Sequence, residues 1–246
     1  MGIGPGTQGH MTPEAVSAIE GSQVIVGYAP FLERLGPLVY NKEVISLGMT
    51  EEVPRAEHAI GAALSGKRVA VVSSGDPGIY GMAGLVLELM RHQEVELEVT
   101  VVPGVTALSA AAARLGAPLM HDFAVISLSD LLTSWEVIRQ RLEAAAVADF
   151  VVVLYNPSSH TRSQRIRECR DIMLRYRRAD TPVGMVRNAL REGEEVTIST
   201  LEAMVEHQID MLTTIIIGNS STFVWNGRMV TPRGYRIEGP GGDERK

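Results

Sequence analysis

The sequence contains a single cysteine, Cys169, among its 246 residues. A disulfide therefore cannot form within the chain, and a reducing compartment such as the cytoplasm is expected. Basic residues are also in the minority, because 23 Lys and Arg stand against 29 Asp and Glu, for a formal net charge of −6. This acidic balance argues against general binding of nucleic acid or of membrane surfaces.

Long apolar runs and an export signal are missing as well. The two runs that come closest to bilayer length are interrupted by Asp149 and Gly218. The start, MGIGPGTQGHMTPEA, has neither the basic segment nor the apolar core of a signal peptide. The six histidines are scattered without the spacing of metal ligands. We therefore expect a soluble cytoplasmic protein without a metal site.

Apolar residues make up 45% of the chain, and short β-branched runs alternate with helical patterns. Strands are expected at residues 22–28, 43–48, 67–75, 96–104, 123–129, 150–157, 182–186, 194–200 and 212–219. Helices are expected at residues 11–21, 53–66, 104–116, 134–146 and 160–178. Thr12 is a predicted N-cap, since Pro13 follows it at the first helical position. The alternation predicts an α/β architecture.

A domain boundary is expected in LGAPLMHDF, where Gly116 and Pro118 end a helical pattern. The prediction is an N-terminal α/β domain over residues 1–118 and a C-terminal α/β domain over residues 119–235. Residues 236–246 have the sequence RIEGPGGDERK, which is mostly polar and rich in Gly, so a disordered tail is predicted.

Three expected turns in the first half carry Gly and Pro: GIGPG (2–6), SSGDPGIYG (73–81) and VVPGVTA (101–107). Ligands of open α/β sheets lie outside the carboxyl ends of the strands, and glycine lets a backbone approach a ligand closely. Each turn alone is also typical of an ordinary strand end. Together they predict the floor of a small-molecule site. A dinucleotide fingerprint is the weaker interpretation, because G-x-G-P-G differs from G-x-G-x-x-G.

The second half has polar residues at or near its expected strand ends, namely Tyr155, Asn156, Asn188 and Thr213. Their side chains can hydrogen-bond an adenine or a ribose edge. Taken singly, each residue is more often a turn former or a satisfied core polar group.

Several long segments carry a family resemblance. The ordered turns GIGPG, SSGDPGIYG and PGVTALSAAAARLG are similar to the signatures of the tetrapyrrole methylases, S-adenosylmethionine-dependent enzymes of corrin and sirohaem synthesis. Further segments, among them ADFVVVLYNPSS, TPVGMVRNALREGE and MVTPRGY, resemble the branch that methylates C17 of a corrin precursor. The resemblance covers residues 1–235.

The resemblance implies two α/β domains with S-adenosylmethionine in the cleft between them, and a homodimer. It also implies a strand ahead of GIGPG, which is largely absent here. The residues that it places at the cofactor are Pro5, Gly75, Asp76, Ile79, Tyr80, Thr106, Ala107, Tyr155, Asn156, Asn188, Ala189 and Thr213.

The implied reaction is methyl transfer to C17 of a precorrin-3B or cobalt-factor III type tetrapyrrole with ring contraction, in cobalamin biosynthesis. Ring contraction moves protons, so Ser129 and Asp130 are candidates for an acid or base; the alternative for Asp130 is an N-cap. Arg162, Arg165 and Arg187 are candidates for binding the substrate's carboxylates, and Arg191 is a secondary one beside Arg187. Two alternatives stay open: a methylase acting at another ring carbon, and a non-catalytic tetrapyrrole-binding homologue.

Overall fold

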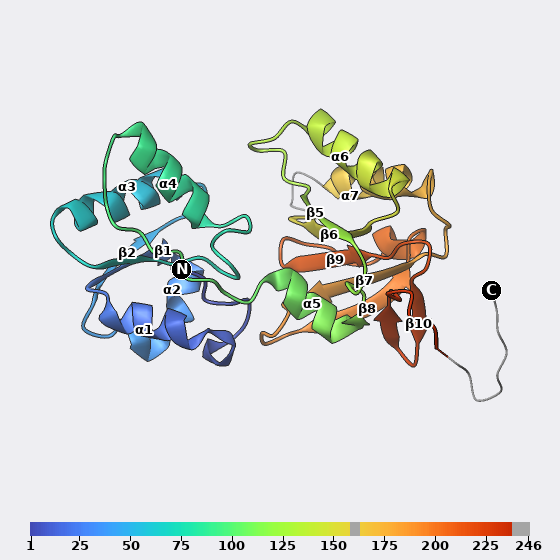
Figure 1. The fold of residues 1–246 in the computed structure, drawn as a ribbon, viewed down its shortest axis with the longest axis horizontal. Helices are drawn as coiled ribbons and strands as arrows, with labels where there is room; N and C mark the ends of the chain where they lie inside the picture. Colours follow the sequence, from blue (N-terminus) through green and yellow to red (C-terminus); the bar gives the residue numbers. More distant parts are fainter. Residues whose placement is uncertain (158–162, 238–246) are drawn as a thin grey trace. The chain divides into compact units, whose positions relative to one another are not determined.

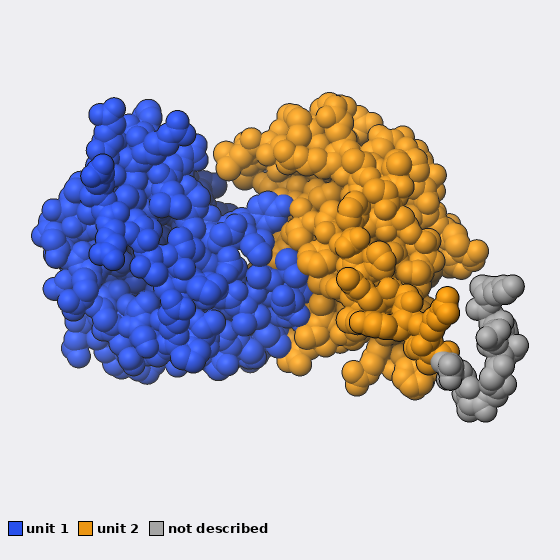
Figure 2. Space-filling view, in the orientation of Figure 1, with its two compact units in different colours: residues 1–110, 189–192 blue, residues 111–188, 193–246 orange. Residues whose placement is uncertain are grey.

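The computed structural model describes residues 1–157 and 163–237 (Figure 1). Two compact units make up the chain (Figure 2). Unit 1 comprises Met1–Ala110 together with Ala189–Glu192, and unit 2 comprises Ala111–Asn188 and Gly193–Lys246. The domain limits expected at residues 118 and 235 stay predictions, and most of the expected disordered tail lies outside the described residues.

Unit 1 is built on a three-stranded parallel sheet in the order β2-β1-β3. The strands are β1 (Val24–Tyr28), β2 (Glu43–Leu47) and β3 (Val69–Val71). Its helices are η1 (Gln8–His10), α1 (Pro13–Gly21), α2 (Ala29–Glu33), η2 (Gly36–Val39), α3 (Glu52–Leu64) and α4 (Met82–His92). The predicted cap is confirmed, because the Thr12 side chain accepts a hydrogen bond from the Ala15 N–H.

Helices cover both faces of this sheet, with α1 and α2 on one side and α3 and α4 on the other (Figure 1). Ile25 of β1 packs with Ile19 and Leu32 on the first side. Its neighbours in the strand point the other way, and Val24 and Val26 pack with Ala59. A strand buried on both faces is apolar at every position, which explains the unbroken apolar run that the sequence shows here.

The strand expected at residues 96–104 is wrong: no strand is assigned there. The backbone N–H of Gly2 donates to Val102 O at 2.9 Å. Among the described residues, no other backbone hydrogen bond joins residues 96–102 to the sheet of unit 1 or to the start of the chain beside it. A cavity of about 740 Å³, lined in part by Val69–Val71 and by Leu97–Val102, lies in unit 1 beside them. A strand needs a paired neighbour, so a segment of β-forming residues without one stays irregular.

Unit 2 contains a five-stranded mixed sheet in the order β5-β6-β9-β7-β8. The strands are β5 (Phe123–Ser127), β6 (Val151–Tyr155), β7 (Pro182–Arg187), β8 (Glu195–Thr200) and β9 (Thr213–Ile217). Only β5 and β6 are parallel to each other; the other neighbours are antiparallel. The helices packed in this unit are α6 (Trp135–Val147), α7 (Ser163–Leu174) and η3 (Ala203–Glu206).

Helix α5 (Ala107–Leu115) ends in unit 2, where Leu115 packs against Gly184 of β7. A Cβ on Gly184 would lie 2.3 Å from Leu115 Cδ1, so this position needs glycine. A second small sheet, in the order β10-β11-β4, was not predicted. It consists of β4 (Gly116–Ala117), β10 (Phe223–Trp225) and β11 (Arg228–Val230).

The α/β class expected from the sequence is confirmed. Helix α4 was not predicted, since no helix was expected over its residues. No helix in the described ranges combines the length and the apolar character that crossing a bilayer requires.

Candidate functional site

The three Gly/Pro turns of unit 1 meet at their glycines. A Cβ on Gly104 would lie 2.2 Å from Gly75 O and 2.9 Å from Gly2 Cα, and a Cβ on Gly2 would lie 2.4 Å from Gly75 O. Gly75 itself has a φ of +66°, and the nearest atom to its Cβ would be Ala107 N at 3.7 Å. Gly2 and Gly104 therefore permit close backbone contact, whereas Gly75 permits a left-handed conformation.

The sequence analysis placed Gly75 at the cofactor, and it gave no individual role to Gly2 or Gly104. A signal existed that could have found them, since both lie within proline-containing turns that the sequence singled out. The sequence does not show which turn each glycine faces.

Asp76 connects two of the turns. Its Oδ1 accepts from the Gly78 N–H at 2.8 Å, within its own turn, and its Oδ2 accepts from the Gly104 N–H at 3.0 Å. Hydrogen bonds to an ionised carboxylate are stronger than neutral ones. The aspartate therefore holds the second turn against the third.

The same turns expose apolar side chains. Ile79, Tyr80 and Val105 are 36%, 57% and 38% exposed. Pro5 is buried, and Thr106 Oγ1 accepts from the Ser109 N–H at 3.2 Å at the start of α5. Apolar groups beside polar backbone turns suit a ligand with a flat ring and polar edges.

In unit 2, the ends of β5 and β6 are joined by side chains. Asn156 follows Tyr155 with a φ of +51°, and its Nδ2 donates to Ser127 Oγ at 3.0 Å. Ser127 Oγ also accepts from the Ser129 N–H at 3.2 Å. Three of the predicted residues, Tyr155, Asn156 and Ser129, thus gather at this edge of the sheet.

Two further candidates lie together at the facing ends of β7 and β9. The Asn188 N–H donates to Leu212 O at 3.1 Å, and Asn188 has a φ of +50°. Thr213 is buried, and its Oγ1 donates to Asp210 Oδ1 at 3.0 Å. That hydroxyl is engaged in its own turn. Ala189, which directly follows Asn188, is buried and belongs to unit 1.

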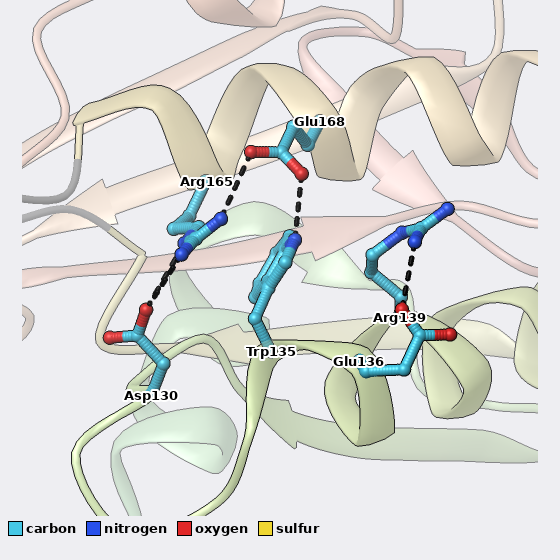
Figure 3. Close-up of polar contacts among 6 residues, drawn as sticks. All are labelled: Asp130, Trp135, Glu136, Arg139, Arg165 and Glu168. Atoms are coloured by element: carbon cyan, nitrogen blue, oxygen red, sulfur yellow. Dashed lines mark hydrogen bonds and ion pairs between the residues drawn. The ribbon is translucent and has the colours of Figure 1, made fainter.

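Asp130 and Arg165, expected to be catalytic and substrate-binding, are paired with each other (Figure 3). Arg165 Nε donates to Asp130 Oδ2 at 3.1 Å, and its Nη1 donates to Glu168 Oε1 at 3.1 Å. Its guanidinium carbon lies 4.5 Å from the centroid of the Trp135 ring, and Trp135 Nε1 donates to Glu168 Oε2 at 2.7 Å. Two carboxylates and an aromatic face therefore already hold Arg165.

Two other arginines, Arg187 and Arg162, were candidates for binding the substrate's carboxylates. Arg187 lies 2.8 Å from Asp210 and 3.6 Å from Glu195, and the hydrogen bond that Arg187 donates to Asp210 raises the pKa of Arg187. Burial acts to raise the pKa of Asp210, but the hydrogen bonds from Arg187, the Leu212 N–H and Thr213 outweigh it and lower that pKa. Arg162 lies outside the described residues.

Comparison with solved structures defines the class of protein. The chain matches a structure described as "Crystal structure of the methyltransferase CobJ", with a TM-score of 0.89 and 35% identity, over 94% of this chain and 97% of that one. The fold is therefore a methyltransferase fold of mixed α/β type.

The sequence comparisons identify the family. A profile described as "Tetrapyrrole (Corrin/Porphyrin) Methylases" matches residues 1–205. The chain is 51% identical to the "Cobalt-factor III methyltransferase" of Priestia megaterium, over 96% of this chain but only 44% of that protein. It is 48% identical to the "Probable cobalt-factor III C(17)-methyltransferase" of Salmonella typhimurium, over 96% of this chain and 98% of that protein. The chain belongs to the tetrapyrrole methylase family.

Proposed function

We propose that this protein transfers a methyl group from S-adenosylmethionine to C17 of a cobalt-factor III or precorrin-3B type tetrapyrrole, with contraction of the ring, in cobalamin biosynthesis. The observation that carries the proposal is the similarity to the Salmonella typhimurium protein along almost the whole of both chains. The name of that relative and of the Priestia megaterium protein favours the cobalt-bearing substrate.

The residues of the motif turns suit the proposed cofactor. S-adenosylmethionine, when bound, supplies an electrophilic methyl group. The exposed apolar side chains of Ile79, Tyr80 and Val105 stand beside backbone turns, which fits a ligand with an aromatic base and polar edges. We propose that the cofactor-binding residues are Pro5, Gly75, Asp76, Ile79, Tyr80, Thr106, Ala107, Tyr155, Asn156, Asn188, Ala189 and Thr213.

The chain's own contribution to the chemistry is positioning. The nucleophile in this reaction is an electron-rich ring carbon of the substrate, so no protein nucleophile is required. Rigid turns, cross-linked by Asp76, hold their backbone in one geometry, and fixed geometry lowers the entropic part of a barrier. We propose that Ser129 and Asp130 handle a proton during ring contraction, with Arg165 orienting Asp130.

We also propose a cytoplasmic homodimer. Support for self-association comes from β10, where Phe223, Val224 and Trp225 are 45%, 46% and 65% exposed on an edge strand. Support for the cytoplasm comes from the single cysteine and from the biosynthetic role. Sedimentation of wild type and of Trp225→Glu tests the dimer: wild type should sediment as a dimer, and the variant should shift toward a monomer.

Locating a label tests the reaction. The protein is incubated with S-adenosylmethionine labelled in its methyl group and with the tetrapyrrole precursor, in cobalt-loaded and cobalt-free form. Label at C17 of a ring-contracted product supports the proposal. Label at another ring carbon, or none with either precursor, contradicts it.

Side-chain variants test the proton-handling assignment in the same assay. Asp130→Asn should lower turnover by about 10²-fold or more, since acid–base catalysis contributes typically 10²–10⁴-fold. Glu136→Gln is the matched control, because Glu136 forms a nearby ion pair with Arg139 at 2.9 Å and is otherwise exposed (Figure 3). Equal turnover in the two variants would mean that Asp130 only anchors Arg165.

A further inference from the structure

Two arginines in unit 1 converge on one serine hydroxyl. Arg34, at the end of α2, donates from Nη1 to Ser74 Oγ at 3.2 Å. Arg191, in the short segment that joins unit 1 from between β7 and β8, donates from Nη2 to the same oxygen at 3.1 Å. Both also brace the first motif turn, Arg34 through Gly4 O at 2.7 Å and Arg191 through Pro5 O.

The sequence interpretation named Arg191 as a secondary candidate and did not single out Arg34. Arg165 and Arg187 each face two carboxylates. Within residues 1–157 and 163–237, no ion pair joins Arg34 or Arg191 to a carboxylate. Every hydrogen bond recorded for the pair goes to a neutral oxygen.

The arrangement is electrostatically costly. Burial lowers the pKa of Arg34 to about 10, and the positive charge of Arg191 contributes to that shift. Burial also lowers the pKa of Arg191. Both side chains still carry their charge at neutral pH. Arg34 Nε is buried without a hydrogen-bond partner in the described residues. Two adjacent, partly desolvated like charges are destabilising unless an anion joins them.

We propose that Arg34, Arg191 and Ser74 form a binding site for a carboxylate of the substrate. Arginine is suited to this ligand, because its planar fork matches the two oxygens of a carboxylate. All three side chains are half-buried, so the cluster also reaches solvent. Ser74 Oγ accepts from both arginines, which leaves its own hydrogen to donate to the carboxylate.

The assignment rests on the proposed function, since corrin precursors carry acetate and propionate groups around the ring. The position of the cluster favours the substrate. It is built on the turn of Gly4 and Pro5, next to Gly75, where the motif turns meet. S-adenosylmethionine also carries a carboxylate, so the experiment needs one arm for each ligand.

The test compares direct binding of two ligands, without turnover. S-adenosylhomocysteine is titrated calorimetrically. Cobalt-factor III is titrated by its absorbance change. Arg34→Gln and Arg191→Gln should each weaken tetrapyrrole binding about tenfold or more, the effect of losing one charge-assisted contact, and change S-adenosylhomocysteine binding less than twofold. Arg191→Lys should recover part of the loss, because it keeps the charge.

Arg68→Gln is the matched control. Arg68 also lies in unit 1 and donates to a backbone carbonyl, Gly21 O at 2.6 Å, but it lies ahead of β3 rather than at the motif turns. Its tetrapyrrole affinity should equal that of wild type. Weaker tetrapyrrole binding in the control, of the same size as in Arg34→Gln and Arg191→Gln, would overturn the site as a general charge effect.

Four other results would overturn the proposal. Unchanged tetrapyrrole affinity in both glutamine variants would do so, as would failure of wild type to bind the tetrapyrrole. Equal weakening of both ligands would mean that the arginines only brace the turn. Weakening of S-adenosylhomocysteine alone would assign the carboxylate to the cofactor. By contrast, wild type that binds the tetrapyrrole without methylating it would refute the proposed function and leave this site standing.

Discussion

Alanine at position 104 should destabilise unit 1 more than alanine at position 75. The new Cβ of Gly104→Ala would lie 2.2 Å from Gly75 O and 2.9 Å from Gly2 Cα. All of these neighbours are backbone atoms, so no side chain can rotate away. One turn must move by about an ångström, and overpacking of this kind costs about 1–3 kcal/mol.

Alanine substitutions at two other glycines serve as comparisons for the stability effect of Gly104→Ala. Gly75→Ala meets nothing closer than 3.7 Å, so its cost is that of a left-handed φ, about 1–2 kcal/mol. Gly84 lies inside α4 with no atom within 4 Å of its Cβ, and Gly84→Ala should stabilise the helix by up to about 1 kcal/mol. In a chain of this size each kcal/mol moves Tm by about 2–4 °C.

Thermal unfolding followed by circular dichroism measures the series. Gly104→Ala should lower Tm by about 2–12 °C, and Gly84→Ala should raise it by a few degrees. Gly104→Ala should also weaken S-adenosylhomocysteine binding in calorimetry, because the displaced turns are the ones proposed to hold the cofactor. A Gly104→Ala variant that unfolds at the wild-type temperature would refute the backbone-contact argument.

Three more outcomes are expected. The lowered pKa of Asp210 means that its stabilising contribution is present above its unfolded pKa of about 3.9 and is lost as pH falls through the folded value. The difference between the urea midpoints of wild type and Asp210→Asn should therefore be full at pH 7 and shrink as the pH falls below about 3.9. Complete burial raises the pKa of Cys169 to about 12, so iodoacetamide should label it only after denaturation; rapid labelling of the native protein would contradict its burial. Joining four β-branched residues ahead of Met1 should raise Tm by several degrees, since Met1 N already donates to Val71 O at 2.8 Å and both residues line the cavity. Four Gly/Ser residues there should have no such effect.

Local signals predicted much of the fold. Thr12 and Pro13 marked the start of α1 because a cap and a fixed φ act within one turn. The apolar run of β6 was identified because a strand buried on both faces needs no alternation. Residues 96–104 begin with apolar residues that alternate with Glu96, Glu98 and Thr100, a pattern also typical of a strand, and form no strand. Pairing depends on a neighbour that the segment does not encode. Helix α4 was missed because Gly81 at its N-cap provides no side-chain cap.

The candidate site divides in the same way. Motifs predicted which turns matter, since Gly and Pro act on their own backbone. They could not predict that Asp76 reaches Gly104, or that Arg165 is paired with Asp130, because those partners lie 28 and 35 residues apart. The same limit applies to Arg34 and Arg191, because only the fold shows that no carboxylate among the described residues pairs with them.

The two-segment composition of unit 1 has a consequence for recombination. Four residues, Ala189–Glu192, are encoded far from Met1–Ala110 but belong with them, and a Cβ on Gly6 would lie 2.5 Å from Leu190 O. A crossover near residue 110 between two homologous genes would therefore combine the first segment of one parent with the four-residue segment of the other. Chimaeras that exchange both segments together should be recovered as folded proteins more often than those that exchange either segment alone.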